Sequence, residues 1–257
     1  MVSLRAPLAK VAAPRRWRLP ARPRPPQSKW RGYGIIAALA LFFGAGNTVV
    51  ASDTNALLTA WLDAQTNLHS WSAAFTQTRT LKALTQPLTA QGHVWFAAPN
   101  RFRWELGNPA LTIAVRQPEQ MLVIYPKLQR AERYPLNGDA AGPWKETLAL
   151  FEAGFPRGRA DLESRFKISS VAVTNDLCSV ALQPKSAAAR RLMPQIKITF
   201  ATNDFSLRAT ELTFADGSSM RNDFTNSQFN LKLDELVFQP QLDPGMKIVE
   251  PLKKGGP

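Results

Sequence analysis

The chain has 257 residues and a formal net charge of +13, with 32 Lys and Arg against 19 Asp and Glu. This length allows one large domain or two small ones. The only cysteine, Cys178, excludes an intramolecular disulfide framework, so the fold has to be stabilised by its hydrophobic core.

The positive charge is concentrated near the N-terminus. Nine basic residues lie between Arg5 and Arg31, and the first acidic residue of the chain is Asp53. From Ser52 onward, 23 basic residues stand against 19 acidic ones, a net charge of about +4. A nucleic-acid-binding arm does not need an apolar run directly after its basic residues, so we expect no nucleic-acid partner.

Residues 1–51 have the order of a secretory signal peptide. A basic, Pro-rich stretch ends at Arg31, an apolar run covers residues 33–45, and the small residues Val49 and Ala51 precede Ser52. The run is shorter than the roughly 20 residues that a transmembrane helix needs. We therefore predict a cleaved signal peptide over 1–51 and a single periplasmic domain over 52–257, with an uncleaved N-terminal anchor as the alternative.

Residues 55–68 have the period of an amphipathic helix. Leu58, Trp61 and Leu62 recur at spacings of three and four, and Asp53 or Thr54 could serve as the N-cap. The period then changes to two over residues 71–79, which predicts a strand.

The rest of the chain consists mainly of short alternating runs separated by Pro, Gly and Asn, as in an antiparallel meander. The predicted strands cover residues 91–97, 101–106, 110–116, 120–125, 129–134, 166–174, 178–183, 195–201, 207–214, 218–224 and 236–238. Asp216-Gly217 is a hairpin signal. Between the two sets of strands, residues 143–155 have apolar residues at helical spacing after a proline, which predicts a short apolar helix.

Residues that commonly perform acid-base or nucleophilic chemistry are scarce. His69 and His93 are the only histidines, and neither belongs to a metal-binding or nucleophile motif. Cys178 lies among apolar residues of a predicted strand, where a lone cysteine is more often an inert core residue than a nucleophile paired with His93. We expect no enzymatic activity, no cofactor and no metal site.

The most informative segment is a predicted hairpin over residues 92–106. Alternation places Val94 and Phe96 on one face of the first strand, and Phe102 and Trp104 on one face of the second. Two adjacent strands therefore present aromatic side chains together.

This segment resembles the LolA family of lipoprotein carriers, in which a helix, a Phe-x-Gln strand and an aromatic hairpin follow one another. The matching residues are Phe75-Thr76-Gln77, Gly92, Trp95, Pro99, Asn100, Phe102 and Trp104. Further similarity is found at Tyr125-Pro126, Phe238-Gln239-Pro240 and Asp243-Pro244-Gly245.

The resemblance implies a mainly β (α+β) fold, in which one strongly curved antiparallel sheet forms an incomplete barrel covered by a few short helices. It implies a monomeric periplasmic carrier that holds acyl chains of lipoproteins in a hydrophobic cavity. Such a carrier receives them from an inner-membrane release complex and delivers them to an outer-membrane acceptor. The candidate cavity residues are Phe75, Val94, Phe96, Phe102, Trp104, Leu148, Phe151, Ile198 and Phe214. Ordinary core packing is the alternative for each aromatic residue among them.

The sequence departs from the family pattern at two positions. Ala98 stands where family members from enteric bacteria carry an Arg that is thought to hold the lid closed, and Pro118-Glu119-Gln120 replaces an Asp-Gly turn. Two alternatives to a lipoprotein shuttle follow: a periplasmic protein that binds or transfers a glycolipid or free lipid, and a lipoprotein-sensing regulatory module of the same fold.

Overall fold

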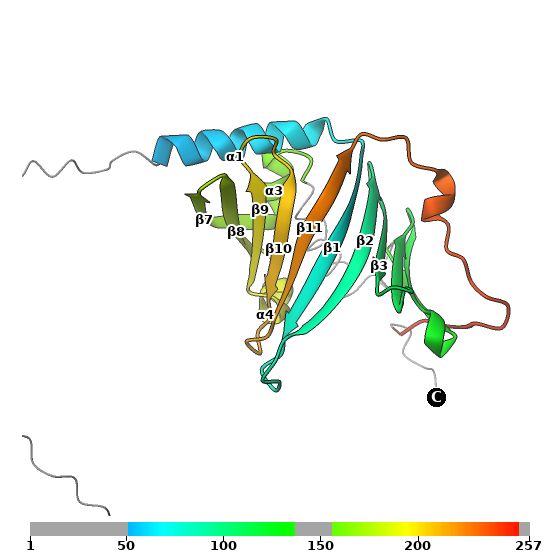
Figure 1. Ribbon diagram of the computed structural model, residues 1–257. Coiled ribbons are helices and arrows are strands. Elements are labelled where there is room, and N and C mark those ends of the chain that lie inside the picture. Colours follow the sequence, from blue (N-terminus) through cyan, green and yellow to red (C-terminus); the bar gives the residue numbers. More distant parts are fainter. Residues whose placement is uncertain (1–50, 137–155, 252–257) are drawn as a thin grey trace, which may run out of the picture. The chain divides into compact units, whose positions relative to one another are not determined.

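The computed structural model describes residues 51–136 and 156–251, and from residue 54 it also describes the side chains (Figure 1). The helices are α1 (Ala51–Thr66), α3 (Arg159–Arg165) and α4 (Ala187–Leu192), with 3-10 helices η1 (Pro126–Leu128) and η4 (Glu235–Phe238). The strands are β1 (Ser70–Thr80), β2 (Leu88–Ala97), β3 (Arg101–Leu106), β4 (Thr112–Arg116), β5 (Gln120–Tyr125), β6 (Arg130–Pro135), β7 (Phe166–Thr174), β8 (Leu177–Pro184), β9 (Gln195–Ala201), β10 (Leu207–Thr213), β11 (Ser219–Phe229) and β12 (Lys247–Val249).

All twelve of these strands belong to one sheet, in the order β12-β6-β5-β4-β3-β2-β1-β11-β10-β9-β8-β7. Every neighbouring pair is antiparallel except β12 with β6. The sheet curls strongly, so that one of its faces is concave (Figure 1). The predicted fold class, a single curved antiparallel sheet with a few helices, is confirmed.

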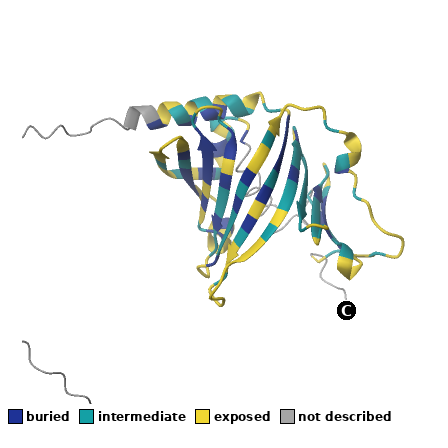
Figure 2. Ribbon diagram, viewed as in Figure 1, coloured by how far each residue is buried: buried dark blue, intermediate teal, exposed yellow. Residues whose placement is uncertain are grey.

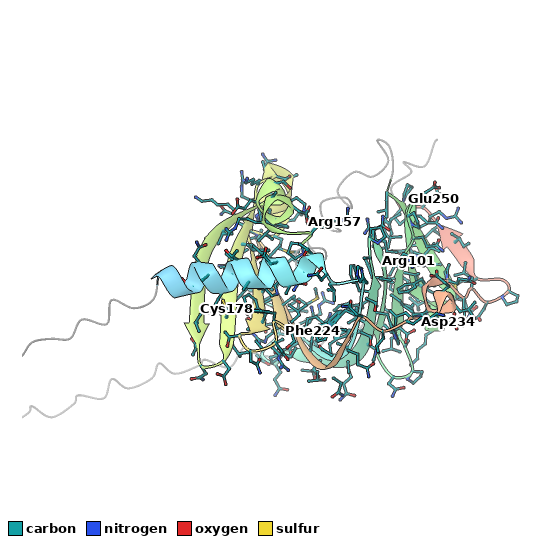
Figure 3. The ribbon with its side chains drawn as sticks, turned by 90° about the horizontal axis from the view of Figure 1, so that it is seen from above. Arg101, Arg157, Cys178, Phe224, Asp234 and Glu250 are labelled. Carbon is teal, nitrogen blue, oxygen red and sulfur yellow. The ribbon has the colours of Figure 1, made fainter. Side chains whose placement is uncertain are left out.

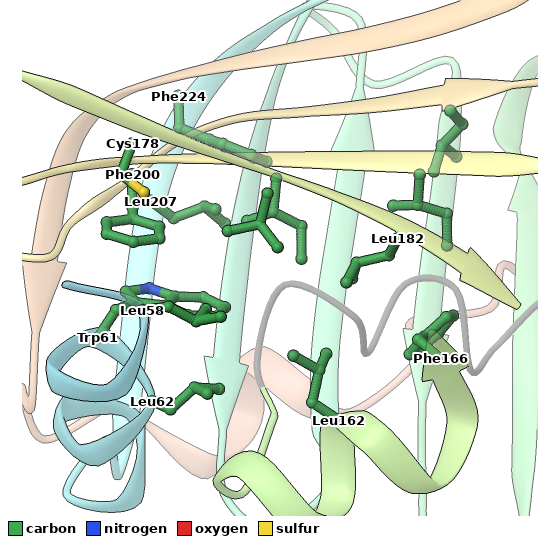
Figure 4. Close-up of a cluster of buried hydrophobic side chains, with 14 of the residues drawn as sticks. Leu58, Trp61, Leu62, Leu162, Phe166, Cys178, Leu182, Phe200, Leu207 and Phe224 are labelled. Carbon is green, nitrogen blue, oxygen red and sulfur yellow. The ribbon is translucent and has the colours of Figure 1, made fainter. Parts of the chain in front are cut away.

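Helix α1 lies across one end of the sheet and packs against its concave face (Figures 1 and 4). Leu58, Trp61 and Leu62 are almost fully buried, as the helical spacing predicted. The Trp61 ring stacks on Phe200 of β9, with centroids 4.8 Å apart and an interplanar angle of 3°. Burial is deepest where α1 meets the sheet, on β8 and β9 (Figure 2). Apolar burial on this side supplies the main core.

Several predicted elements differ in the structure. Helix α1 begins at Ala51, so the prediction of an N-cap at Asp53 or Thr54 is wrong. Residues 236–238 form part of η4 instead of a strand, because the Asp234 carboxylate accepts a hydrogen bond from the Leu236 backbone N–H and starts a helical turn. The helices α3 and α4 and the strand β12 were not predicted. The predicted helix over 143–155 lies outside the described residues.

The segment around η4 passes along the convex face of the sheet beside β3. The Arg101 guanidinium forms an ion pair with Glu235 and lies over the Phe238 ring, 5.1 Å from its centroid. Arg103 donates a hydrogen bond to the Val237 carbonyl at 3.3 Å. These contacts hold residues 235–238 on the convex face, opposite the aromatic side chains of β3.

Candidate functional site

Aromatic side chains from β1, β3 and β11 meet on the concave face and form its floor. The Phe75 ring lies 4.0 Å from Trp104 and 6.1 Å from Phe224, measured between centroids. Trp104 meets Phe224 edge to face at 6.3 Å, and Trp71 meets it at 5.1 Å. These tilted and edge-to-face arrangements are the favoured geometries of aromatic pairs. Together the four rings make a continuous apolar floor.

The position of Phe75 depends on a glycine in the neighbouring strand. Phe75 is the direct cross-strand partner of Gly92, and its ring covers the space where a side chain of residue 92 would stand. A Cβ atom at Gly92 would lie 2.2 Å from Cζ of Phe75 and 2.3 Å from the backbone oxygen of Glu105. The glycine therefore lets the phenyl ring lie flat on the sheet and reach Trp104.

The predicted hairpin is present as β2 and β3, with the expected faces. Val94 pairs with Trp104 and Phe96 pairs with Phe102, so these four side chains share the concave face. Trp95 lies on the opposite face, where its ring contacts His93 at 4.1 Å between centroids. The prediction of two adjacent strands presenting aromatics together is confirmed.

The structure brings most of the candidate cavity residues together. Phe75, Val94 and Ile198 are buried members of the main cluster, and Phe96, Trp104 and Phe214 pack against it while partly exposed. Phe102 is the exception, because it packs against a second cluster of Met121, Val123 and Tyr134 further along the same face. Leu148 and Phe151 lie outside the described residues. Core packing accounts for the buried members, whereas the partly exposed rings are available to line a cavity.

A row of polar side chains crosses the concave face next to the apolar floor, from β1 through β11 to β10. Gln77 donates a hydrogen bond to Asn222 at 3.0 Å, and Asn222 donates to the Thr210 hydroxyl at 3.2 Å. Gln77 and Asn222 are both almost fully buried. These side chains satisfy one another, and apolar residues of the main cluster, Leu212 and Met220, continue on the other side of the row.

A second polar group limits the face at β6. Glu132 accepts hydrogen bonds from the Tyr134 hydroxyl at 2.5 Å and from Arg130 at 2.6 Å. Burial and the negative charge of Glu132 raise the pKa of Tyr125 on the next strand, with Arg130 opposing them. The carboxylate is thus held between hydroxyl and guanidinium groups at the far side of the concave face.

A hollow of about 240 Å³ opens at the rim, between the end of α1 and the turn that joins β2 to β3. Its walls include Leu68, Phe96, Ala98 and Pro99, together with Arg157 from the segment before α3. The Arg157 guanidinium donates a hydrogen bond to the Pro99 carbonyl at 3.1 Å, and the view from above shows it near the end of α1 (Figure 3). Ala98 contributes only a small apolar surface here.

The cysteine, histidine and carboxylate side chains that could perform chemistry are far apart or form ion pairs within a helix. Cys178 is buried on β8, and burial raises the pKa of its thiol, whereas His93 lies on β2 with four strands between them. Asp161 and Glu163 pair with arginines of their own helix. Within 51–136 and 156–251, no three His, Cys, Asp or Glu side chains are grouped to hold a metal ion.

Two residues of the floor were missed by the sequence analysis. Trp71 pairs directly with Phe96, and Phe224 pairs directly with Phe75 across β11. The alternation of Trp71 with Phe75 could have identified the first. Phe224 required the pairing of β1 with β11, which joins segments far apart in the sequence.

The arrangement of helix, aromatic hairpin and curved sheet can be compared with known proteins. The family model described as "outer membrane lipoprotein carrier protein LolA" matches residues 66–241. The chain belongs to the LolA family. The resemblance seen in the hairpin motif is therefore confirmed.

Solved structures similar to this LolA-family chain share little sequence with it. A conserved protein from Thermus thermophilus is 8% identical, with a TM-score of 0.45, over 77% of this chain and 99% of that one. A LolA superfamily protein from Nitrosomonas europaea is 8% identical, with a TM-score of 0.38, over 70% of this chain and 96% of that one. The lipoprotein LppX from Mycobacterium tuberculosis is 10% identical, with a TM-score of 0.35, over 72% of this chain and 99% of that one. No curated protein matches the chain in sequence.

No helix in the described part of the chain is both long and apolar enough to cross a membrane.

Proposed function

We propose that this LolA-family protein is a periplasmic carrier that holds acyl chains of lipoproteins on its concave face and moves them from the inner to the outer membrane. Residues 1–51 would direct export, and residues 52–257 would form the carrier domain. The cargo would be received from an inner-membrane release complex and passed to an outer-membrane acceptor. No bond is made or broken in this role.

The observation that carries the proposal is a group of partly exposed aromatic rings on the concave face. One of them, Trp104, belongs to the apolar floor, whose other rings Trp71, Phe75 and Phe224 are buried. Phe96, Phe102 and Trp104 stand side by side on β2 and β3, yet each remains partly exposed in the described part of the chain. Large aromatic rings contribute most to stability when they are fully buried, so their partial exposure favours a binding surface over plain core. The hollow at the rim provides access to this floor beside Phe96.

The energetics of acyl-chain transfer suit such a surface. Each methylene group removed from water contributes about 0.8 kcal/mol, so six of them would supply about 5 kcal/mol. That is enough for reversible holding, and it requires shape and apolar area instead of reactive groups.

The test is co-purification with an acylated lipoprotein, followed by mass spectrometry of the bound species. Wild-type protein is expected to retain the acylated lipoprotein and not to retain the same lipoprotein without acyl chains. Phe96→Ser should weaken retention, whereas the matched variant Trp95→Ser, on the opposite face of the same strand, should not. Absence of any acylated species from the wild-type protein would refute the proposal.

A second candidate function keeps the site and changes the cargo to a glycolipid or free lipid. The rim favours it in one respect: Ala98 offers no guanidinium, and the arginine at the rim is Arg157, which bonds to the Pro99 carbonyl from another segment. Extraction of the bound lipid from protein purified without an overproduced lipoprotein distinguishes the two, since a free lipid or glycolipid would then be recovered.

A further inference from the structure

A second hollow, of about 170 Å³, lies on the other side of the end of α1. Its apolar walls come from Ala64 and Leu68, from Trp71 on β1, and from Leu207 and Phe229 on β10 and β11. Phe229 is 42% exposed although it is a large aromatic residue. Trp71 and Leu207 belong to the main core, whereas the exposed Phe229 ring is not buried by it, so the hollow is a candidate binding site.

The two hollows are neighbours on one apolar row. Gln65 and Leu68 line both of them, so the end of α1 forms the wall between the two. Trp71 lines the second hollow and Phe96 lines the first, and these residues are direct partners in adjacent strands. Phe229 is in turn the partner of Trp71 on β11. The row Phe229, Trp71, Phe96 therefore passes beneath the helix end.

Two of the polar side chains at the second hollow, Asn230 and Asp204, are already engaged within the protein. The Asn230 side chain accepts a hydrogen bond from the His69 backbone N–H at 2.8 Å and donates one to the Asn67 carbonyl at 3.2 Å. Asp204 accepts two hydrogen bonds from Ser206. Because these groups are satisfied, the hollow offers an occupant mainly apolar surface, which suits a hydrocarbon chain better than a polar ligand.

We infer that the second hollow takes a second acyl chain of the same lipid, so that the cargo straddles the end of α1 with one chain on each side. This inference rests on the proposed function and narrows the cargo to lipids that carry two or more acyl chains. A single-chain amphiphile would fill only one of the hollows.

Substitutions at two positions on α1 affect one hollow each and can therefore distinguish them. Ala64 lines the second hollow only, and Thr66 lines the first only. Ala64→Leu should fill the second hollow, and Thr66→Leu should narrow the first. The probes are dimyristoyl phosphatidylglycerol, with two chains, and its single-chain lyso form, and their affinities for the purified protein are measured by native mass spectrometry.

Wild-type protein should bind the two-chain probe more tightly by about tenfold or more, the gain that about two further buried methylene groups would give. Ala64→Leu should remove this margin and leave single-chain binding unchanged, whereas Thr66→Leu should weaken binding of both probes. Phe229→Ala, at a partly exposed position, should reduce the margin without filling the hollow, so the test does not depend on one variant folding.

Equal wild-type affinity for the two probes, or an unchanged margin in both Ala64→Leu and Phe229→Ala, would overturn the second-chain site and leave the carrier function standing. Binding of neither probe by the wild-type protein would overturn both.

Discussion

Gly92→Ala should destabilise the protein because residue 92 lies beneath the Phe75 ring. The added Cβ would stand 2.2 Å from Cζ of Phe75 and 2.3 Å from the Glu105 backbone oxygen, whereas carbon atoms in contact are normally about 3.5–4.0 Å apart. The ring can move only by leaving its 4.0 Å contact with Trp104, and the backbone oxygen can move only if β3 shifts.

The expected magnitude follows from two opposing effects. Overpacking typically costs about 1–3 kcal/mol, and the backbone clash places this site at the upper end. Replacing glycine within a strand returns about 0.5–1 kcal/mol of conformational entropy. We therefore expect Gly92→Ala to lower the free energy of unfolding by about 2 kcal/mol, measured as a lower urea midpoint at an unchanged m-value.

Two further variants test the reasoning. Gln91→Ala, at the exposed neighbouring position, should change stability by less than about 0.5 kcal/mol. With Phe75→Leu already in place, Gly92→Ala should cost less than it does alone, which a double-mutant cycle would measure as a coupling of at least about 0.5 kcal/mol. A Gly92→Ala protein as stable as the wild type would refute the account of how Phe75 is positioned.

Substitutions at three other positions are expected to have distinct effects on stability. The Trp61 indole N–H has no hydrogen-bond acceptor among the described residues, so Trp61→Phe should lower the free energy of unfolding by less than about 1.5 kcal/mol, measured in urea. Trp61→Ala should lower it by about 3–5 kcal/mol, because it leaves a cavity. Similar losses in the two variants would contradict this prediction. Burial lowers the pKa of His93 from its ordinary 6.5, with Glu105 opposing, so the unfolded chain binds the proton more readily and stability should fall as pH drops below about 6.5. His93→Gln should flatten that part of the pH profile, and an unchanged profile would count against the assignment. Glu235→Gln removes an exposed partner of Arg101 and should cost less than about 1 kcal/mol of unfolding free energy; a larger loss would assign the C-terminal segment more stability than this contact provides.

The long elements of the fold could be predicted because the spacing of their apolar residues along the sequence indicates a helix or a strand. The helix that buries Leu58, Trp61 and Leu62 has apolar spacings of three and four, and strands such as β2 and β3 have apolar residues at a spacing of two in the sequence. The elements that were missed lack such a pattern. The short helices α3 and α4 each bury one side chain, Leu162 and Ala189 respectively, and β12 depends on its pairing with β6. Tertiary contacts form these elements, and local sequence does not specify them.

Only the part of the candidate site on strands that are consecutive in sequence could be predicted. Alternation placed Phe96 and Phe102 on one face, because the hairpin joins residues close in sequence. It could not assign Phe102 to a different cluster from Trp104, since the curvature of the sheet decides which side chains meet. Phe224 entered the site through long-range pairing of β11 with β1, which no local pattern reveals.

Acyl-chain binding on the concave face can be measured as equilibrium binding of an acylated lipoprotein to the purified protein. The purified protein should bind the acylated form, and Phe96→Ser should weaken that binding by about tenfold or more, equivalent to about two methylene groups returned to water. Trp95→Ser, on the opposite face, should bind as the wild type does. Equal affinity for the acylated and non-acylated lipoprotein, with no effect of Phe96→Ser, would contradict the account.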